Sequence, residues 1–206
     1  MSDKMIESNK VSIIGKIAEG FTYSHEVYGE GFYMTSLKVN RLSDQVDMVP
    51  VMISERLIDI TQDYIGQTVE AIGQFRSYNY HEGPKNRLIL SVFVREINFI
   101  DEFTDYTKTN QIYLNGYICK APGYRKTPLG REITDLLVAV NRPYGKSDYI
   151  PCIAWGRNAR YAAGFSVGSN IELWGRVQSR EYTKNMGENQ SEKRVAYEVS
   201  VSKLGH

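Results

Sequence analysis

The sequence contains few of the residue types that build covalent or metal sites: among 206 residues there are two cysteines and three histidines. Cys119 and Cys152 lie apart and in no Cys-x-x-Cys pattern, so we expect two reduced core thiols rather than a disulfide or a metal site. No apolar run approaches the ~18 residues that would span a membrane, and the polar start, 1–10, has no apolar signal core. We therefore expect a cytoplasmic protein with no membrane contact, no metal and no cofactor.

Motifs of catalysis are also missing from the sequence. It has no phosphate-binding loop, no His-Glu-x-x-His pattern and no cluster of carboxylates, and none of the three histidines pairs with a nucleophile. The segment YGEGFY, 28–33, has two glycines but fits a turn better than a phosphate loop. We therefore expect a binding protein or an interaction protein, and no enzyme.

The net charge is only +1, but the charges are unevenly distributed along the chain. Residues 1–106 carry 10 Lys and Arg against 16 Asp and Glu, a net charge of −6, whereas residues 107–206 carry 15 against 8, a net charge of +7. This split predicts that the second half meets an anion and the first half does not. The alternative, that the acidic and basic halves merely attract each other, remains open.

The chain repeats itself. The segment NKVSIIGKI, 9–17, aligns with NQIYLNGYI, 110–118, at an offset of 101 residues, and VNR recurs at the same offset, 39–41 against 140–142. The offset is 102 where Gly73 meets Gly175, and 107 where NRLILSVFV, 86–94, meets KRVAYEVSV, 193–201. It grows only where a turn-rich loop lengthens. We infer a duplicated unit, with a divergent acidic copy at 1–100, a polar linker at 101–109 and a basic copy at 110–206.

Each unit is predicted to contain five strands and one short helix. In the first unit, alternating apolar residues indicate strands near 11–17, 32–39, 48–53, 68–75 and 88–99. Residues 54–66 show helical spacing between the third and fourth strands. This order is typical of an OB-fold barrel, and the strand glycines fit sharp bends at barrel corners. A β-sandwich is the alternative, which the helix disfavours. The predicted fold class is all-β, with two tandem five-stranded OB-fold barrels.

The second unit places aromatic and basic residues on the outer face of its strands. In SDYIPCIAWGR, 147–157, Ile150, Cys152 and Ala154 form a small apolar inner row, and the outer row holds Tyr149 and Trp155. Interleaved rings and guanidinium groups form a platform on which unpaired bases stack while cations follow the phosphates. The candidate DNA-binding residues are Tyr144, Tyr149, Trp155, Trp174, Tyr182, Arg125, Lys126, Arg142, Arg157, Arg160, Arg176 and Arg180.

Other roles for these residues remain open. Trp155 and Trp174 could belong to an oligomer interface, where aromatic residues are enriched, and a bulge would change the side on which Trp174 lies. Stacking and phosphate contacts serve RNA as well as DNA, so the sequence does not choose between the two.

The segment PGYRKTPLGREITDLLVAVNRPYGKSDYIPCIAWGRNA, 122–159, together with GSNIELWGRVQSREY, 168–182, resembles the bacterial single-stranded DNA-binding protein family. The likeness covers residue 110 to about residue 204. It implies OB-fold barrels that bind single-stranded DNA without sequence specificity, in replication, repair or recombination. It also places the stacking aromatics at Tyr144, Tyr149, Trp155 and Tyr182, and a loop arginine at Arg125. Because that family usually works with four OB folds, we expect a homodimer of two-barrel chains.

The first unit keeps this framework but lacks the platform. Met48 stands where the second unit has Tyr149, Ser54 stands where it has Trp155, and only Tyr80 matches a stacking residue of the second unit. Its net negative charge would repel phosphates, so we expect the first unit to serve mainly assembly. The alternative is a second, differently placed nucleic-acid surface made by Phe32, Tyr33, Tyr78 and Tyr80.

The family's flexible tail with an acidic tip is not recognisable after SVSKLGH, 200–206. We therefore expect no recruitment of repair proteins through such a tail, and a specialised, nucleoid-associated or mobile-element-encoded member of the family. The alternative function is a primosome-like accessory that bridges DNA and protein partners.

Overall fold

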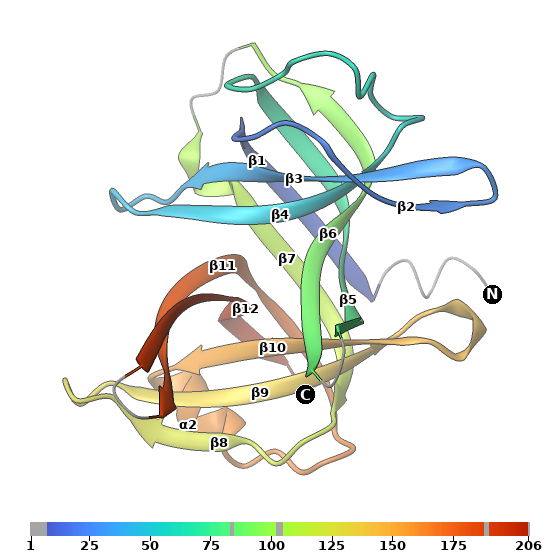
Figure 1. The fold of residues 1–206 in the computed structure, drawn as a ribbon. Helices are drawn as coiled ribbons and strands as arrows, with labels where there is room; N and C mark the ends of the chain where they lie inside the picture. The colour runs from blue at the N-terminus through green and yellow to red at the C-terminus, as the bar shows by residue number, and fades with distance from the viewer. Residues whose placement is uncertain (1–7, 83–84, 102–104, 188–189, 206) are drawn as a thin grey trace.

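The computed structural model describes residues 8–82, 85–101, 105–187 and 190–205, and it forms two β-barrels (Figure 1). The first barrel consists of β1 Asn9–Ile17, β2 Thr22–Val27, β3 Glu30–Asn40, β4 Val46–Ser54, β5 Thr68–Glu82 and β6 Lys85–Phe99. The second consists of β7 Asn110–Ile118, β8 Gly123–Lys126, β9 Glu132–Asn141, β10 Ser147–Trp155, β11 Asn170–Gly187 and β12 Gln190–Gly205. The 3-10 turns η1 Tyr106–Lys108 and η2 Pro143–Gly145 and the helix α2 Arg157–Ala162 complete the described elements.

The two barrels have the same strand pairing. In the first, β1 pairs with both β3 and β5, and a parallel contact of β4 with β6 closes the barrel. In the second, β7 pairs with β9 and β11, and β10 meets β12 in parallel. The alternation on β10 is as predicted, with Ile150, Cys152 and Ala154 buried in the core. This closure confirms the tandem OB-fold class; β2 and β8 are additional short strands that pair with β3 and β9 in the segments expected to be loops.

Gly73 and Gly175 occupy equivalent corners of the two barrels. A Cβ atom at Gly73 would lie 1.9 Å from the carbonyl oxygen of Phe93, and one at Gly175 would lie 2.1 Å from that of Ser200. Both glycines sit at register shifts, where β6 and β12 each carry one extra residue. The strands therefore approach too closely at these corners for any side chain, which is why both copies keep glycine.

The helix predicted at 54–66 of the first unit is not formed, and this part of the prediction is wrong. Turns connect β4 to β5 there, whereas the second barrel has α2. Asp59 Oδ1 accepts a 3.0 Å hydrogen bond from the Thr61 amide, and Asp63 Oδ1 accepts a 2.9 Å bond from the Ile65 amide. Such side-chain bonds to the nearby backbone compete with helical ones. In α2, by contrast, Ala159 and Ala162 are good helix formers and are buried against the barrel.

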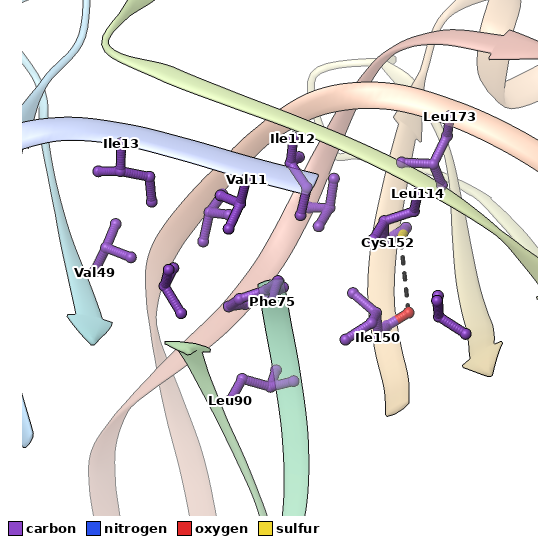
Figure 2. Close-up of a cluster of buried hydrophobic side chains, with 14 of the residues drawn as sticks. Val11, Ile13, Val49, Phe75, Leu90, Ile112, Leu114, Ile150, Cys152 and Leu173 are labelled. Atoms are coloured by element: carbon purple, nitrogen blue, oxygen red, sulfur yellow. Dashed lines mark hydrogen bonds between the residues drawn. The ribbon is translucent and has the colours of Figure 1, made fainter. Parts of the chain in front are cut away.

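The barrels are joined side by side through β1 and β7. These strands pair in antiparallel fashion, so that all twelve strands belong to one sheet. Val11 faces Ile112 in the register, and these two residues are counterparts under the offset of 101. An internal two-fold axis therefore passes through this pair. Figure 2 shows Val11 next to Ile112, and the buried cluster runs from one barrel into the other.

Hydrogen bonds between the barrels follow the same two-fold axis. The Ser77 amide on β5 donates to Asp148 Oδ1 on β10 at 2.8 Å, and the Ser179 amide on β11 donates to Asp47 Oδ1 on β4 at 3.0 Å. Arg142 pairs with Asp148 at 3.0 Å, as Arg41 pairs with Asp47 at 2.6 Å. In Figure 1 the lower end of β5 reaches β10, where the first of these contacts lies. Beside the β1–β7 pairing, the junction of the barrels therefore contains the same polar contact twice.

Candidate nucleic-acid interface

Trp155 ends β10 on the outer face of the second barrel. Its side chain is 36% exposed, and its Nε1 donates a 3.2 Å hydrogen bond to Ser200 Oγ on the neighbouring strand β12. Inward-facing Ala154, which precedes it, is fully buried. Because alternate residues on a strand point to opposite faces, burial of the small row forces the indole ring outward, and the bond to Ser200 fixes one of its edges.

An open hollow of about 500 Å³ lies beside Trp155. Its wall contains Arg131, Arg176 and Arg180 of the second barrel, and Arg41 of the first. Burial and the nearby charge of Arg41 lower the pKa of the Arg176 guanidinium. The hollow therefore combines an aromatic ring with arginines and carries an excess of positive charge.

Three other predicted aromatics are also exposed on the second barrel. Tyr149 on β10 is 44% exposed, and Tyr182 on β11 is 38% exposed with the Arg180 guanidinium 5.9 Å from its ring centre. Tyr144 lies in η2, is 99% exposed and has a φ of 63°. A non-glycine residue with positive φ is uncommon, and here that conformation holds the ring in solvent. Tyr144 lines a different hollow from Trp155.

Trp174 does not line the hollow of Trp155 or that of Tyr144. Its ring centre is 5.1 Å from that of Tyr113 on β7, and the Lys203 ammonium lies 4.6 Å above it. It lines a third hollow, formed along β1, β7 and β11. The extra residue of the bulge near Trp174 lies on β12 and not on β11. The alternation along β11 is therefore uninterrupted, and the Trp174 side chain stays on the outer face.

Several of the predicted basic residues already have carboxylate partners. Nitrogen–oxygen distances are 2.8 Å for Arg125–Asp135, 3.3 Å for Arg160–Glu132 and 3.1 Å for Arg180–Glu198. Both side chains of the Arg125–Asp135 pair are exposed, and such pairs contribute only ~0–1 kcal/mol, so a phosphate can replace the carboxylate there at little cost. In the Arg180–Glu198 pair the carboxylate is buried. Lys126 and Arg157 are exposed, and no ion pair joins either to another residue that the structure describes.

The structure also brings basic residues of the first unit to this surface, which the sequence did not predict. Arg41 lines the Trp155 hollow, and Arg76 and Arg95 line the hollow of Tyr144. The repeated VNR segment could have indicated Arg41, because its counterpart Arg142 was a candidate. Arg76 and Arg95 have no arginine counterparts in the second unit, so no such signal existed for them.

The described parts of the chain show neither a metal site nor a membrane-spanning helix. No group of three or more His, Cys, Asp or Glu side chains is placed there to hold a metal ion. No helix in the same residues has both the length and the apolar character needed to cross a membrane.

Comparison with solved structures supports the tandem fold. The chain superimposes on the wild-type single-stranded DNA binding protein from Thermus aquaticus with a TM-score of 0.69 at 19% identity, over 96% of this chain and 91% of that one. At this level of identity the likeness establishes the fold alone.

Comparison of sequences gives the family. Residues 109–205 match the sequence model of the Single-strand binding protein family. Single-stranded DNA-binding protein 3 of Listeria innocua is 36% identical over 85 residues, which cover 38% of this chain and 53% of the relative. The chain thus spans about half the length of that relative. Single-stranded DNA-binding protein B of Bacillus subtilis is 32% identical over 87 residues, covering 39% of this chain and 77% of the relative. The chain therefore belongs to the single-strand binding protein family.

Proposed function

We propose that the protein binds single-stranded DNA without sequence preference, in replication, repair or recombination. The observation that carries this proposal is the outward Trp155 ring at the edge of a hollow walled by arginines. Stacked bases use the aromatic faces and the phosphates follow the cations, an arrangement that tolerates any sequence. The names of the Listeria and Bacillus relatives support the same function.

The proposed contacts divide into two kinds. Tyr144, Tyr149, Trp155 and Tyr182 offer faces to bases, and the basic residues contact phosphates. Duplex DNA hides its base faces in the stack, so this surface favours single strands. Trp174 packs between Tyr113 and Lys203 and lines neither the Trp155 hollow nor the Tyr144 hollow, and we assign it a structural role in the second barrel. The phosphate contacts are proposed for Arg125, Lys126, Arg142, Arg157, Arg160, Arg176 and Arg180.

The proposal extends to the organisation of the protein. The units are 1–100 and 110–206, joined by the linker 101–109, and two chains associate to supply four barrels, as the family resemblance implies. The protein acts in the cytoplasm by binding alone, without catalysis.

The experiment that tests this function is a titration with oligo-dT. Tryptophan emission should be quenched on binding, and affinity should fall as salt rises, because phosphate contacts release counterions. Duplex DNA and single-stranded RNA of equal length serve as competitors. Flat emission and flat anisotropy at low salt would refute DNA binding, and stronger competition by RNA would reassign the substrate.

A further inference from the structure

The hollow beside Tyr144 is the two-fold counterpart of the hollow beside Trp155. It has a volume of about 420 Å³ and is lined by Arg76 and Arg95 of the first barrel and by Arg142, Tyr144 and Lys146 of the second. Arg142 and Lys146 correspond, at the offset of 101, to Arg41 and Gln45 in the Trp155 hollow. The same corner of the junction therefore forms a basic hollow twice.

An arginine and a glutamine have exchanged places between the two hollows. Arg76 donates to Gln74 Oε1 at 2.8 Å on β5, and Arg176 donates to Gln178 Oε1 at 3.3 Å on β11. At the offset of 102, Arg76 corresponds to Gln178 and Gln74 corresponds to Arg176. Each hollow thus contains one strand arginine that donates a hydrogen bond to a glutamine two residues away. In the alignment of the two units, by contrast, each of these arginines is matched with the glutamine of the other unit.

Arg95 has no basic counterpart in the second unit. It lies on β6, in the bulge opposite Gly73. The register passes from Ile72–Glu96 to Gly73–Val94, so Arg95 is the extra residue of the bulge. Its counterpart Ser202 is the extra residue on β12. Bulges redirect a side chain relative to the regular strand. Arg95 is therefore a second cation that the first barrel adds to the hollow.

An aromatic ring lies between these two arginines. The Arg76 and Arg95 guanidinium carbons are 4.0 Å and 5.2 Å from the centre of the half-buried Phe93 ring. Phe93 corresponds to Ser200, which in the second barrel accepts the hydrogen bond of Trp155. The first barrel has Ser54 at the position of Trp155 and Phe93 at the position of Ser200. Each barrel therefore has one aromatic residue in this pair of positions, but on different strands.

The positive charge of the Tyr144 hollow is not balanced. Asp148, which pairs with Arg142, is the only carboxylate that lies within 4.0 Å of the four cations among the residues described. Burial, together with the charges of Arg142 and Arg95, lowers the pKa of Arg76 to about 10. An anion in the hollow would relieve this repulsion and would accept charge-assisted hydrogen bonds.

We propose that the Tyr144 hollow binds a backbone phosphate of the single-stranded nucleic acid through Arg76, Arg95 and Arg142. The first barrel, despite its net charge of −6, thereby contacts the nucleic acid directly. This inference rests on the proposed function. The exposed Tyr144 ring, which lines the hollow, favours a polynucleotide over a free phosphate, because a free phosphate has no base to stack.

The test compares two pairs of substitutions that remove the same charge from the first barrel. The variant Arg76→Gln with Arg95→Ser introduces the residue types found at Gln178 and Ser202, which occupy the equivalent corner. The control is Lys16→Gln with Lys38→Gln; these exposed residues face each other across β1 and β3, at the opposite end of β1 from Asn9, which lines the hollow. Affinity for long oligo-dT is measured by anisotropy over a range of salt, and thermal melts establish that both variants fold.

The arginine variant should bind several-fold more weakly than the control, and its plot of log affinity against log salt should be less steep by about 0.7 for each phosphate that it no longer neutralises. Quenching of Trp155 by the oligonucleotide should persist, which separates this inference from the proposed function. Equal affinity and slope in the two variants would overturn it. It would also be overturned if inorganic phosphate stabilised the wild type but not the arginine variant while DNA binding stayed equal, because the hollow would then serve a free anion. A wild type that does not bind oligo-dT would refute the function itself.

Discussion

Asp148 on β10 of the second barrel accepts a 2.8 Å hydrogen bond from the backbone amide of Ser77 on β5 of the first. The hydroxyl of Ser77 in turn accepts a 2.7 Å bond from the Tyr149 amide. The side chain of Asp148 is fully buried and lies 3.0 Å from Arg142. One carboxylate therefore ties the two barrels together and sits directly before a residue of the proposed platform.

Replacing Asp148 with alanine should destabilise the protein by about 3 kcal/mol, because it leaves the partly buried Arg142 charge without its partner. The Ser77 amide would also be left without an acceptor. Asp47→Ala should have a similar effect, since Asp47 makes the equivalent contacts with Ser179 and Arg41. Unfolding in urea, followed by far-UV circular dichroism, measures both.

The control for this prediction is Asp44→Ala, in the exposed loop between β3 and β4. Surface substitutions of this kind usually change the free energy of unfolding by less than ~0.5 kcal/mol. If Asp148→Ala and Asp44→Ala unfold at the same urea concentration, the inter-barrel contact contributes no stability.

The duplication and the barrels could be predicted because both leave periodic signals in one sequence. Alternation of apolar residues was enough to predict that Ile150, Cys152 and Ala154 face the core. Gly73 and Gly175 indicated an equivalent corner in each of the two barrels. The prediction of a helix at 54–66 is wrong because it rests only on the spacing of Leu57, Ile60 and Tyr64. It leaves out Asp59 and Asp63, whose side chains accept backbone hydrogen bonds that stabilise turns.

The junction between the barrels could not be predicted from alternation within single strands. The pairing of β1 with β7 joins the edges of two separate barrels. The apolar alternation around Val11 and Ile112 shows which side chains face the core, but it does not show which strand pairs with which. The contribution of Arg76 and Arg95 was hidden for a related reason. A net charge summed over 1–106 conceals where individual cations lie, and both arginines point to a hollow that exists only when the barrels are joined.

Trp155→Ala should weaken binding of oligo-dT by about 1–3 kcal/mol, the usual contribution of one stacked base. Trp174→Ala is the matched control, because it removes the other indole, which packs on Tyr113 outside the proposed platform. Anisotropy of a labelled oligonucleotide measures both affinities at one salt concentration. A larger loss for Trp174 than for Trp155 would contradict the proposed base contacts.

Cys152 should not react with a thiol reagent in the folded protein. Its side chain is fully buried, and burial raises the pKa of the thiol well above its usual range, so the reactive thiolate is scarce at neutral pH. Cys119 is partly exposed, and burial raises its thiol pKa as well, so it should react slowly. Absorbance after addition of a disulfide reagent, with and without urea, counts the reactive thiols. Rapid modification of two thiols without denaturant would show that the β10 core opens readily.

Residues 107–206 expressed alone should associate with a second copy through β7. Removing the first barrel exposes the edge of β7 that pairs with β1, along with Ile112, and an unpaired apolar edge strand is a template for pairing. Because the two-fold axis passes through Val11 and Ile112, a second β7 can occupy the place of β1 in nearly the same register. Sedimentation velocity should report a dimer, and Ile112→Lys should shift it towards monomer by placing a charge at the centre of the contact. A folded monomer at micromolar concentration would show that the β1–β7 edge does not by itself drive association.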